Sequence, residues 1–473
     1  MGKFELILIP SPGIGHLAST IGLAKLLVSR DERLSVTVLI IQTPPETNIK
    51  SYKDIFATDS ISGLQFIELP RVESSAPNSV LSDEFMAAQK KPVRYAVEKI
   101  AESGKTRISG IIVDMFCTQI IDVANEFGIP SYVFFTSGAA TLGLTLHLQN
   151  LRDEFSKDIT EFKDSDVQLS VPTFVNPVPA KVLPSILLDK TGGGSARFLN
   201  MAKRIRETKG ILINTFLELE SHALKSLSDD ENIPPVYSVG PIINFTKKGN
   251  NQEEDLIIKW LDNQPISSVV FLCFGSMGSF DNDEIKEIAS ALERSGHRFL
   301  WSLRKLSRKD KPSVSSDYEN FEDVLPKGFL ERISARGKVI GWSPQMEVLS
   351  HSAVGGFVSH CGWNSILESV WTGVPIATWP MYAEQQANAF QMIKELEMAV
   401  EIKMDYRKDF LTPKGKIVTT EEIENGIKIL MDPENEIWKK VKQMKENSRM
   451  ALEKGGSSYN SLGTFINEFM VNA

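Results

Sequence analysis

Residues 342–385 read WSPQMEVLSHSAVGGFVSHCGWNSILESVWTGVPIATWPMYAEQ, and this stretch decides the fold that we expect. Its apolar run GGFVS predicts a buried strand, and SILESVWTG predicts a helix. Residues 360–365 then form a strand-to-helix turn, where free backbone N–H groups and the positive end of the helix dipole favour an anion. Gly362 lets the backbone approach such a group closely.

Side chains around this turn extend its binding capacity. His360, Asn364 and Ser365 supply hydrogen-bond donors. Glu368 lies four residues beyond Asn364, about 6 Å further along the same helix face. A carboxylate there would repel phosphate but could accept both hydroxyls of a ribose. Trp342 can stack on a nucleobase. An ordinary capped helix would explain any one of these residues, but it does not explain the whole set in this order.

The stretch resembles the donor-binding box of plant family 1 glycosyltransferases, which use uridine diphosphate (UDP) sugars to glycosylate small secondary metabolites. The resemblance extends to PSPGIGH at residues 10–16 and to GGSS at residues 455–458, so it spans nearly the whole chain. It implies an α/β fold with two Rossmann-like doubly wound domains that face each other across a cleft (GT-B). It also implies a UDP-sugar as co-substrate.

The resemblance implies a role for each part of the box. Uracil would meet Trp342 and Gln345, the ribose would meet Glu368, and the sugar would meet the end of the box, where Glu384 stands in place of the Asp of many members. The diphosphate would meet the turn at residues 360–365 and a serine of the separate FGS turn. The complete donor-binding set is Ser276, Trp342, Ser343, Gln345, His360, Trp363, Asn364, Ser365, Glu368, Glu384 and Gln385.

A candidate catalytic pair lies in the N-terminal half. His16 follows the first apolar strand, and Asp114 ends the strand GIIVD; open parallel sheets place their ligands at the carboxyl ends of strands. A neutral imidazole can take a proton from an acceptor hydroxyl, and a carboxylate behind it fixes its tautomer. Either residue could instead cap or pack a helix. The family uses a His–Asp pair, and the resemblance assigns it to His16 and Asp114.

The glycines before His16 also fit a dinucleotide-binding turn, because Gly13-Ile-Gly15 follows a strand and opens a helix. A nicotinamide enzyme would carry an acid at the end of its second strand to bind the adenosine ribose. Here that strand ends VLIIQTPP, without an acid, which disfavours a dehydrogenase.

The alternation of apolar strands and helices occurs twice along the 473 residues, a length too great for one core. We expect an acceptor-binding domain with the catalytic base at 1–241 and a UDP-sugar-binding domain at 255–455. The polar stretch at 242–254 would link them, and a helix at 456–473 would cross back to the first domain.

Composition excludes several other classes of protein. A net charge of -8 argues against nucleic acid or an acidic membrane as partner. No apolar run approaches the ~18 residues of a membrane span, and FELILIP is a first strand rather than a signal peptide. Single cysteines at 117, 273 and 361 suit a reducing compartment. We therefore expect a cytoplasmic protein, and a monomer.

We expect no metal site. Two Asp-x-Asp patterns occur, Asp164–Asp166 and Asp281–Asp283. The first lies in a polar stretch, and the second opens a helix, where acids complement the dipole. The diphosphate charge can be met by helix N-termini and the donors of the turn at 360–365.

These observations predict an inverting transferase that moves glucose from UDP-glucose to a hydroxyl of a small apolar acceptor, giving a β-glucoside. The acceptor would lie among residues 78–94, 137–149 and 175–200, where Phe85, Met86 and Phe198, with Phe174 directly before the third segment, are consistent with an apolar pocket. Whether it is a flavonoid, a phenolic or a terpenoid stays open. The alternatives are another UDP-hexose, a nucleotide-sugar epimerase or hydrolase, and a nucleotide-sugar-binding protein without catalysis.

Overall fold

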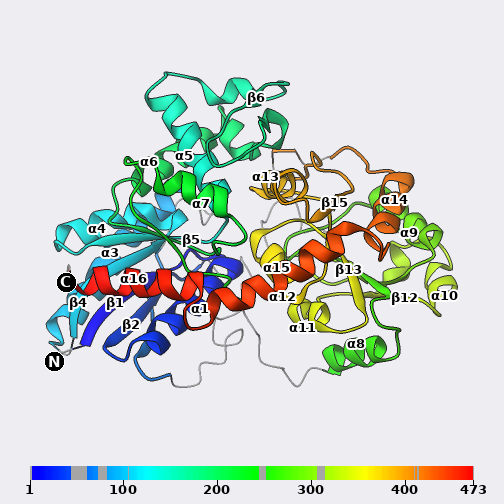
Figure 1. Ribbon diagram of the computed structural model, residues 1–473, viewed down its shortest axis with the longest axis horizontal. Helices are drawn as coiled ribbons and strands as arrows, with labels where there is room; N and C mark the ends of the chain where they lie inside the picture. Colours follow the sequence, from blue (N-terminus) through cyan, green and yellow to red (C-terminus); the bar gives the residue numbers. More distant parts are fainter. Residues whose placement is uncertain are drawn as a thin grey trace.

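A computed structural model describes residues 3–43, 61–72, 82–104, 106–243, 252–305, 315–409, 411–412 and 415–471. Two parallel sheets, each flanked by helices, form the two halves of the molecule (Figure 1). This arrangement confirms the pair of doubly wound α/β domains that the sequence predicts.

The first sheet has seven strands in the order β3-β2-β1-β4-β5-β8-β9, and every neighbouring pair is parallel. Its strands read as continuous apolar runs because both faces are covered. The strands are β1 (Lys3–Ile9), β2 (Leu34–Ile40), β3 (Leu64–Glu68), β4 (Thr106–Asp114), β5 (Ser131–Phe135), β8 (Ile211–Ile213) and β9 (Val236–Ser238). The helices are α1 (Ile14–Arg30), α3 (Asp83–Glu102), α4 (Ile121–Glu126), α5 (Ala139–Asp153), α6 (Gly194–Ile205) and α7 (Ser221–Ser228).

The second sheet has six parallel strands in the order β12-β11-β10-β13-β14-β15. The strands are β10 (Val269–Cys273), β11 (Arg298–Ser302), β12 (Gly337–Ile340), β13 (Val354–Ser359), β14 (Ile376–Thr378) and β15 (Ala399–Glu401). The helices are α8 (Gln252–Asp262), α9 (Asn282–Ser295), α10 (Phe329–Ile333), α11 (Gln345–Ser350), α12 (Trp363–Thr372), α13 (Gln385–Phe390), α14 (Thr420–Leu430), α15 (Glu436–Leu452) and α16 (Ser457–Val471). The sequence analysis missed β15, because its stretch AVE ends in an exposed glutamate and forms no apolar run.

Shorter elements join these layers. An antiparallel pair, β6 (Gln168–Leu169) and β7 (Val178–Pro179), lies outside the two sheets. Short 3₁₀ segments occur at Met115–Ile120, Ile159–Phe162, Ala180–Val182, Ser185–Leu188 and Phe321–Asp323, and α13 continues into a π-helical turn at Gln391–Glu395.

Each sheet has one point where the strand order reverses. In the first sheet the chain moves outward from β1 to β2 and β3, then returns to place β4 on the other side of β1. In the second sheet β13 flanks β10 in the same way. Loops diverge at such a point and leave a crevice at the carboxyl ends of the strands, where open α/β sheets bind ligands. The loops after β1, β4, β10 and β13 are therefore the expected places for a site.

The last helix joins the two halves. α15 packs along α12 in the second half, whereas α16 packs against β9 and β4 of the first sheet (Figure 1). Phe465 of α16 lies edge-on to Tyr132 and Tyr237, with ring centroids 5.2 Å and 5.4 Å away. An exchanged helix of this kind buries apolar surface of one half on the other and so limits their separation.

The exact domain boundaries stay a prediction, with one correction. The linker was predicted to reach residue 254, but α8 already begins at Gln252. Glu253, Glu254 and Asp255 occupy its first turn, where acidic residues complement the dipole, so the charged run belongs to a helix. Residues 244–251 of the predicted linker lie outside the described part of the chain, as do residues 78–81 of the first predicted acceptor segment.

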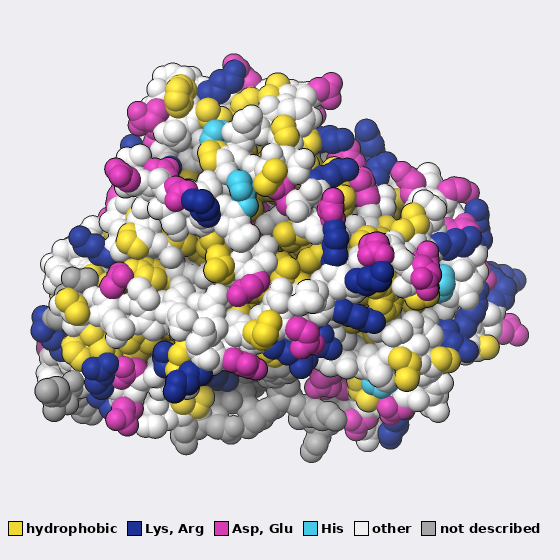
Figure 2. Space-filling model, viewed as in Figure 1, with side chains coloured by type: hydrophobic (Ala, Val, Ile, Leu, Met, Phe, Trp, Pro, Cys, Tyr) yellow, Lys and Arg dark blue, Asp and Glu magenta, His cyan; other side chains and the backbone are white. Residues whose placement is uncertain are grey.

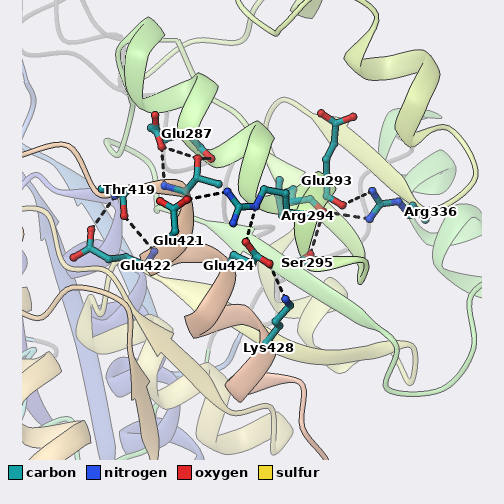
Figure 3. A network of polar contacts seen from close by, with 12 residues as sticks. Glu287, Glu293, Arg294, Ser295, Arg336, Thr419, Glu421, Glu422, Glu424 and Lys428 are labelled. Carbon is teal, nitrogen blue, oxygen red and sulfur yellow. Dashed lines mark hydrogen bonds and ion pairs between the residues drawn. The ribbon is translucent and has the colours of Figure 1, made fainter.

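Ion pairs fasten α14 to α9 at the far edge of the second half (Figure 3). Arg294 of α9 lies 2.9 Å from Glu421 and 2.8 Å from Glu424, and Glu424 also pairs with Lys428. The pairs are mostly exposed, so each contributes little alone to stability.

The surface carries charges of both signs. Acidic and basic side chains are interspersed on the face shown in Figure 2. Within the described ranges, no helix combines the length and the apolar character that crossing a bilayer requires.

Candidate active site

His16 and Asp114 meet at the reversal point of the first sheet. His16 lies in the first turn of α1, directly after β1, and Asp114 is the last residue of β4. Because β1 and β4 are neighbours, the two side chains converge, and His16 Nδ1 lies 2.8 Å from Asp114 Oδ2. The other carboxylate oxygen of Asp114 accepts the N–H of Phe116, which fixes its orientation. Nδ1 therefore carries the proton, and Nε2 is left with its lone pair.

Several effects set the pKa of His16. Burial opposes the charged imidazolium, but the charge and the hydrogen bond of Asp114, helped by the charge of Glu384, outweigh it. The pKa of His16 is consequently raised above its ordinary value. The imidazole is neutral only at a pH above this raised pKa, and in that form it can accept a proton from a hydroxyl that approaches Nε2.

Two aromatic side chains lie in a row beside His16. The Phe116 ring centroid lies 5.1 Å from the imidazole, and Phe198 lies edge-on to Phe116 at 5.6 Å. Phe198 is among the residues predicted to line an acceptor pocket. The other three predicted apolar side chains, Phe85, Met86 and Phe174, are buried in the hydrophobic core. The row formed by Phe116 and Phe198 provides an apolar wall beside the base.

The strand-to-helix turn predicted at residues 360–365 follows β13, at the reversal point of the second sheet. Its backbone is tightly folded: Cys361 adopts a left-handed φ of 62°. A Cβ on Gly362 would lie 2.7 Å from His360 Nε2, so only glycine fits there. The FGS turn after β10 closes on the same imidazole, since a Cβ on Gly275 would also lie 2.7 Å from Nε2. Exposed Ser276 follows directly.

His360 is a buried polar group with an unused atom. Burial lowers the pKa of its imidazole to about 4, so the ring is neutral. Nδ1 is buried and has no hydrogen-bond partner among the described residues. A buried ring nitrogen without a partner is costly in a protein interior. His360 lies beside the N-terminus of α12, a helix end that attracts anions. Binding of an anion there would explain why this costly buried group is present.

Gln345, Ser365 and Glu368 form one hydrogen-bonded group. The side-chain amide of Gln345 donates to Ser365 Oγ at 2.9 Å and to Glu368 Oε2 at 2.6 Å. Burial raises the pKa of Glu368 to about 7, although the bond from Gln345 opposes this shift. A carboxylate in this state gains from any ligand that donates hydrogen bonds to its charged form.

Trp342 and Ser343 stand beside this group. The Trp342 side chain is 48% exposed, an unusual state for an indole and one that leaves its face open to stacking. Ser343 is buried, and its hydroxyl has no partner among the described residues. Both residues precede α11, the helix that begins at Gln345.

At the end of the box, Gln385 has a fixed orientation. Its Oε1 accepts the N–H groups of Met381 and Tyr382 at 2.9 Å and 3.0 Å, so the amide NH₂ must point the other way. Glu384 reaches the first half, where Ser137 Oγ lies 3.4 Å from its carboxylate. Trp363 is buried, and its indole N–H donates to the Asn214 carbonyl at 2.7 Å. Only the ring and the backbone of Trp363 can therefore meet a ligand.

Asn364 joins the donor turn to the helix of His16. Its Nδ2 donates to the Gly15 carbonyl at 3.3 Å, and Ser19 Oγ donates to its Oδ1 at 3.2 Å. The sequence analysis assigned this side chain to phosphate binding, but both of its polar atoms already contact α1. The contact brings the reversal point of the first sheet, with His16, against that of the second sheet, with the turn at residues 360–365.

Sequence reasoning missed several residues that complete the site. Thr136 follows β5, and its hydroxyl lies 2.9 Å from His16 Nδ1. Thr136 stands at the carboxyl end of a strand, as Asp114 does. The expectation that open parallel sheets bind ligands at the carboxyl ends of their strands could therefore have identified Thr136 as well. Asn214 and Glu220 lie in irregular chain after β8, where no pattern marks them.

The second Asp-x-Asp pattern lies at a helix start. Asp281 caps α9 by accepting the N–H groups of Asp283 and Glu284 at 3.2 Å each, as expected for a helix start. Across the described ranges, no cluster of three or more potential metal ligands occurs.

Comparisons with known proteins agree with this site. Residues 240–444 match the family described as UDP-glucoronosyl and UDP-glucosyl transferase. The chain is 55% identical to the UDP-glucose flavonoid 3-O-glucosyltransferase 6 of Fragaria ananassa, over 99% of each chain. A Siraitia grosvenorii transferase crystallised with UDP is 48% identical, with a TM-score of 0.88 over 99% of this chain and 100% of that one. Medicago truncatula UGT71G1, crystallised with UDP-glucose, is 44% identical, with a TM-score of 0.87 over 99% and 98%.

Identity at this level over whole chains, together with two facing doubly wound domains, establishes the family. The chain belongs to the plant family 1 UDP-glycosyltransferases and is a glycosyltransferase that uses a UDP-sugar donor.

Proposed function

We propose that this enzyme transfers glucose from UDP-glucose to a hydroxyl of a small apolar acceptor, with inversion, to give a β-glucoside. The observation that carries the proposal is the orientation of His16. Asp114 holds Nδ1 at 2.8 Å, which directs Nε2 to an incoming hydroxyl beside the aromatic row of Phe116 and Phe198.

The chemistry follows from this arrangement. His16 Nε2 takes the proton of the acceptor hydroxyl, and Asp114 stabilises the imidazolium that forms. The oxygen attacks the anomeric carbon from the face opposite the diphosphate, and the bond between that carbon and the phosphate oxygen breaks. The N-terminus of α12 and His360 meet the negative charge that develops on the departing UDP. Glucose that is α-linked in the donor thus becomes β-linked in the product.

The donor residues divide by the part of UDP-glucose that each meets. Exposed Trp342 stacks on uracil, with Ser343 and Gln345 at its edge, and Glu368 accepts the ribose hydroxyls. The diphosphate meets Ser276, His360, Ser365 and the backbone at Asn364. The glucose meets Trp363, Glu384 and the directed NH₂ group of Gln385. No metal is needed in this scheme, because a helix N-terminus and neutral donors meet the phosphate charge.

The acceptor is proposed by class. A flat aromatic or fused-ring molecule with a hydroxyl fits the wall formed by Phe116 and Phe198. A relative that is 55% identical is named for flavonoid 3-O-glucosylation, which makes flavonoids the first acceptors to test. We further propose a cytoplasmic location, because the cysteines Cys117, Cys273 and Cys361 are buried and unpaired, a state that a reducing compartment maintains. The monomeric state stays a prediction.

One assay tests the reaction. Incubation with UDP-glucose and a panel of flavonoids, simple phenols and terpenoid alcohols should release UDP only when an acceptor is present. The product should have the mass of a glucoside, and its sugar should be cleaved by a β-glucosidase. Release of UDP without any acceptor would indicate a hydrolase. Tight UDP-glucose binding without release would favour a binding protein, and an α-linked product would contradict inversion.

The donor sugar provides a further prediction. UDP-glucuronate carries a carboxylate that needs a cationic partner in a closed cleft, and residues 342–385 contain no Arg or Lys. We expect glucose to be preferred over galactose and glucuronate to be used worst, by about 10-fold or more relative to glucose. Competition of the three donors at equal concentration, read by product mass and retention time, checks this order. A glucuronide as main product would contradict it, and a galactoside would support the alternative of another UDP-hexose.

A further inference from the structure

A turn at residues 136–138, between β5 and α5, lies where the base and the sugar end of the donor site meet. Thr136 contacts His16 Nδ1, and Ser137 contacts Glu384. Gly138 is pressed against the second half: a Cβ there would lie 2.8 Å from the Trp363 ring. The position of this turn therefore affects both the catalytic base and the residues that hold the sugar.

Glu220 contacts this turn and the start of α5. Its side chain is buried, 3% exposed, and its two oxygens accept the N–H groups of Ala139 and Ala140 at 2.8 Å and 2.9 Å. These are the first residues of α5, so the carboxylate neutralises the positive end of that helix. A Cβ on Gly138 would lie 2.9 Å from Glu220 Oε1, which means that the carboxylate and the turn are in direct contact.

Gln391 adds a contact from the other half. Its Nε2 donates to Glu220 Oε1 at 2.7 Å, whereas its own Oε1 is buried without a partner among the described residues. A buried, unpaired carbonyl costs stability, and a methionine of similar length would avoid that cost. Stability alone therefore does not explain why a glutamine stands here.

We propose that Glu220 is a positioning residue for sugar transfer. It fixes the turn at 136–138 against His16 and Glu384, and Gln391 locks that turn to the donor-binding half. Correct placement of base and sugar then depends on the two halves being together. This inference rests on the proposed glucosyl transfer and adds a residue to it that contacts neither substrate.

Two variants test the role. Glu220→Gln keeps the shape but offers only one acceptor oxygen, so an NH₂ group faces a backbone N–H of α5. We expect kcat to fall ~10-fold while the dissociation constant of UDP, which lacks the sugar, stays unchanged. Gln391→Met removes only the donor to Glu220. It should lower kcat ~3-fold without loss of melting temperature.

Thr208→Val is the matched control. Thr208 is buried in the same half, and its hydroxyl donates to the Ile205 and Gly210 carbonyls, away from the turn. This variant should lose thermal stability yet keep wild-type kcat. A merely structural role for Glu220 and Gln391 would instead make kcat follow stability across the three variants.

The outcomes are distinct. Unchanged kcat in folded Gln391→Met, a loss confined to UDP affinity, or an equal kcat loss in Thr208→Val would each overturn the inference. If Glu220→Gln does not fold, Gln391→Met decides alone. Failure of the wild-type enzyme to glucosylate any hydroxyl acceptor would contradict the proposed function instead, since the inference is judged only against measurable wild-type transfer.

Discussion

Replacement of His16 by alanine should lower turnover with phenol and alcohol acceptors by ~10² or more. The imidazole is the only group that we assign to remove the acceptor proton, and its contact with Asp114 at 2.8 Å shows how it is held. Folding and UDP affinity should change little, because the donor residues lie on the other half. Turnover numbers for several acceptors, with UDP binding measured by calorimetry, check both statements. Near wild-type turnover of His16→Ala would contradict the assignment of His16 as the catalytic base.

The variant Asp114→Asn tests the role of Asp114 in orienting and charging His16, as distinct from the proton transfer by His16 itself. It should cost as much as His16→Ala or less, and the double variant should lose much less than the product of the two single effects, because the residues act as one unit. It should also change the pH profile. The neutral imidazole is the active form, so wild-type kcat/KM should fall as the pH drops through the raised pKa of His16, above the ordinary value of about 6.5. Removal of the carboxylate charge lowers that pKa, and the acid limb should move to lower pH. An unmoved acid limb would exclude Asp114 as its cause.

The second large effect concerns the nucleoside. Glu368→Ala should weaken UDP itself ~10-fold to 10²-fold, because two ribose hydroxyls lose a charged acceptor. Gln385→Ala should leave inhibition by free UDP near normal but impair use of UDP-glucose. Gln385→Glu keeps an acceptor for the N–H groups of Met381 and Tyr382 but replaces the outward NH₂ by a carboxylate oxygen, so it should also impair use of UDP-glucose. Equal UDP affinity in the Glu368 and Gln385 variants would contradict this division of roles.

Glu368 also makes donor binding depend on pH. Burial raises the pKa of its carboxyl to about 7, and the ribose hydroxyls bind the charged form. UDP-glucose affinity should therefore be full above that value and decline as the pH falls through it. Glu368→Gln cannot titrate and should bind weakly with a flat profile, which makes it the control. A wild-type affinity that does not vary between pH 6 and 8 would be inconsistent with a ribose contact to Glu368.

Local pattern was sufficient for much of this protein. Apolar runs and turns predicted both parallel sheets except β15, whose stretch AVE ends in an exposed glutamate and forms no apolar run. The donor box could be interpreted from sequence because it is contiguous: β13, the turn and α12 follow one another, so residue spacing along the chain fixes spacing in space. The turn geometry at His360 and Gly362 matches that local logic. The contact of Gln345 with Glu368, 23 positions away, additionally requires α11 to pack on α12.

Contacts between distant segments were beyond local pattern. His16 and Asp114 are 98 positions apart, and only the order of the strands, with β4 beside β1, brings them together. The contact of Asn364 with α1, the N–H bond of Trp363 to Asn214, and the bond of Gln391 to Glu220 require two independently wound halves to pack in one orientation. Each of these bonds depends on where whole sheets lie relative to each other. The spacing of residues along the chain therefore does not predict any of them. The sequence by itself thus determined the two sheets and the donor turn, whereas the tertiary structure decided how the base and the donor meet.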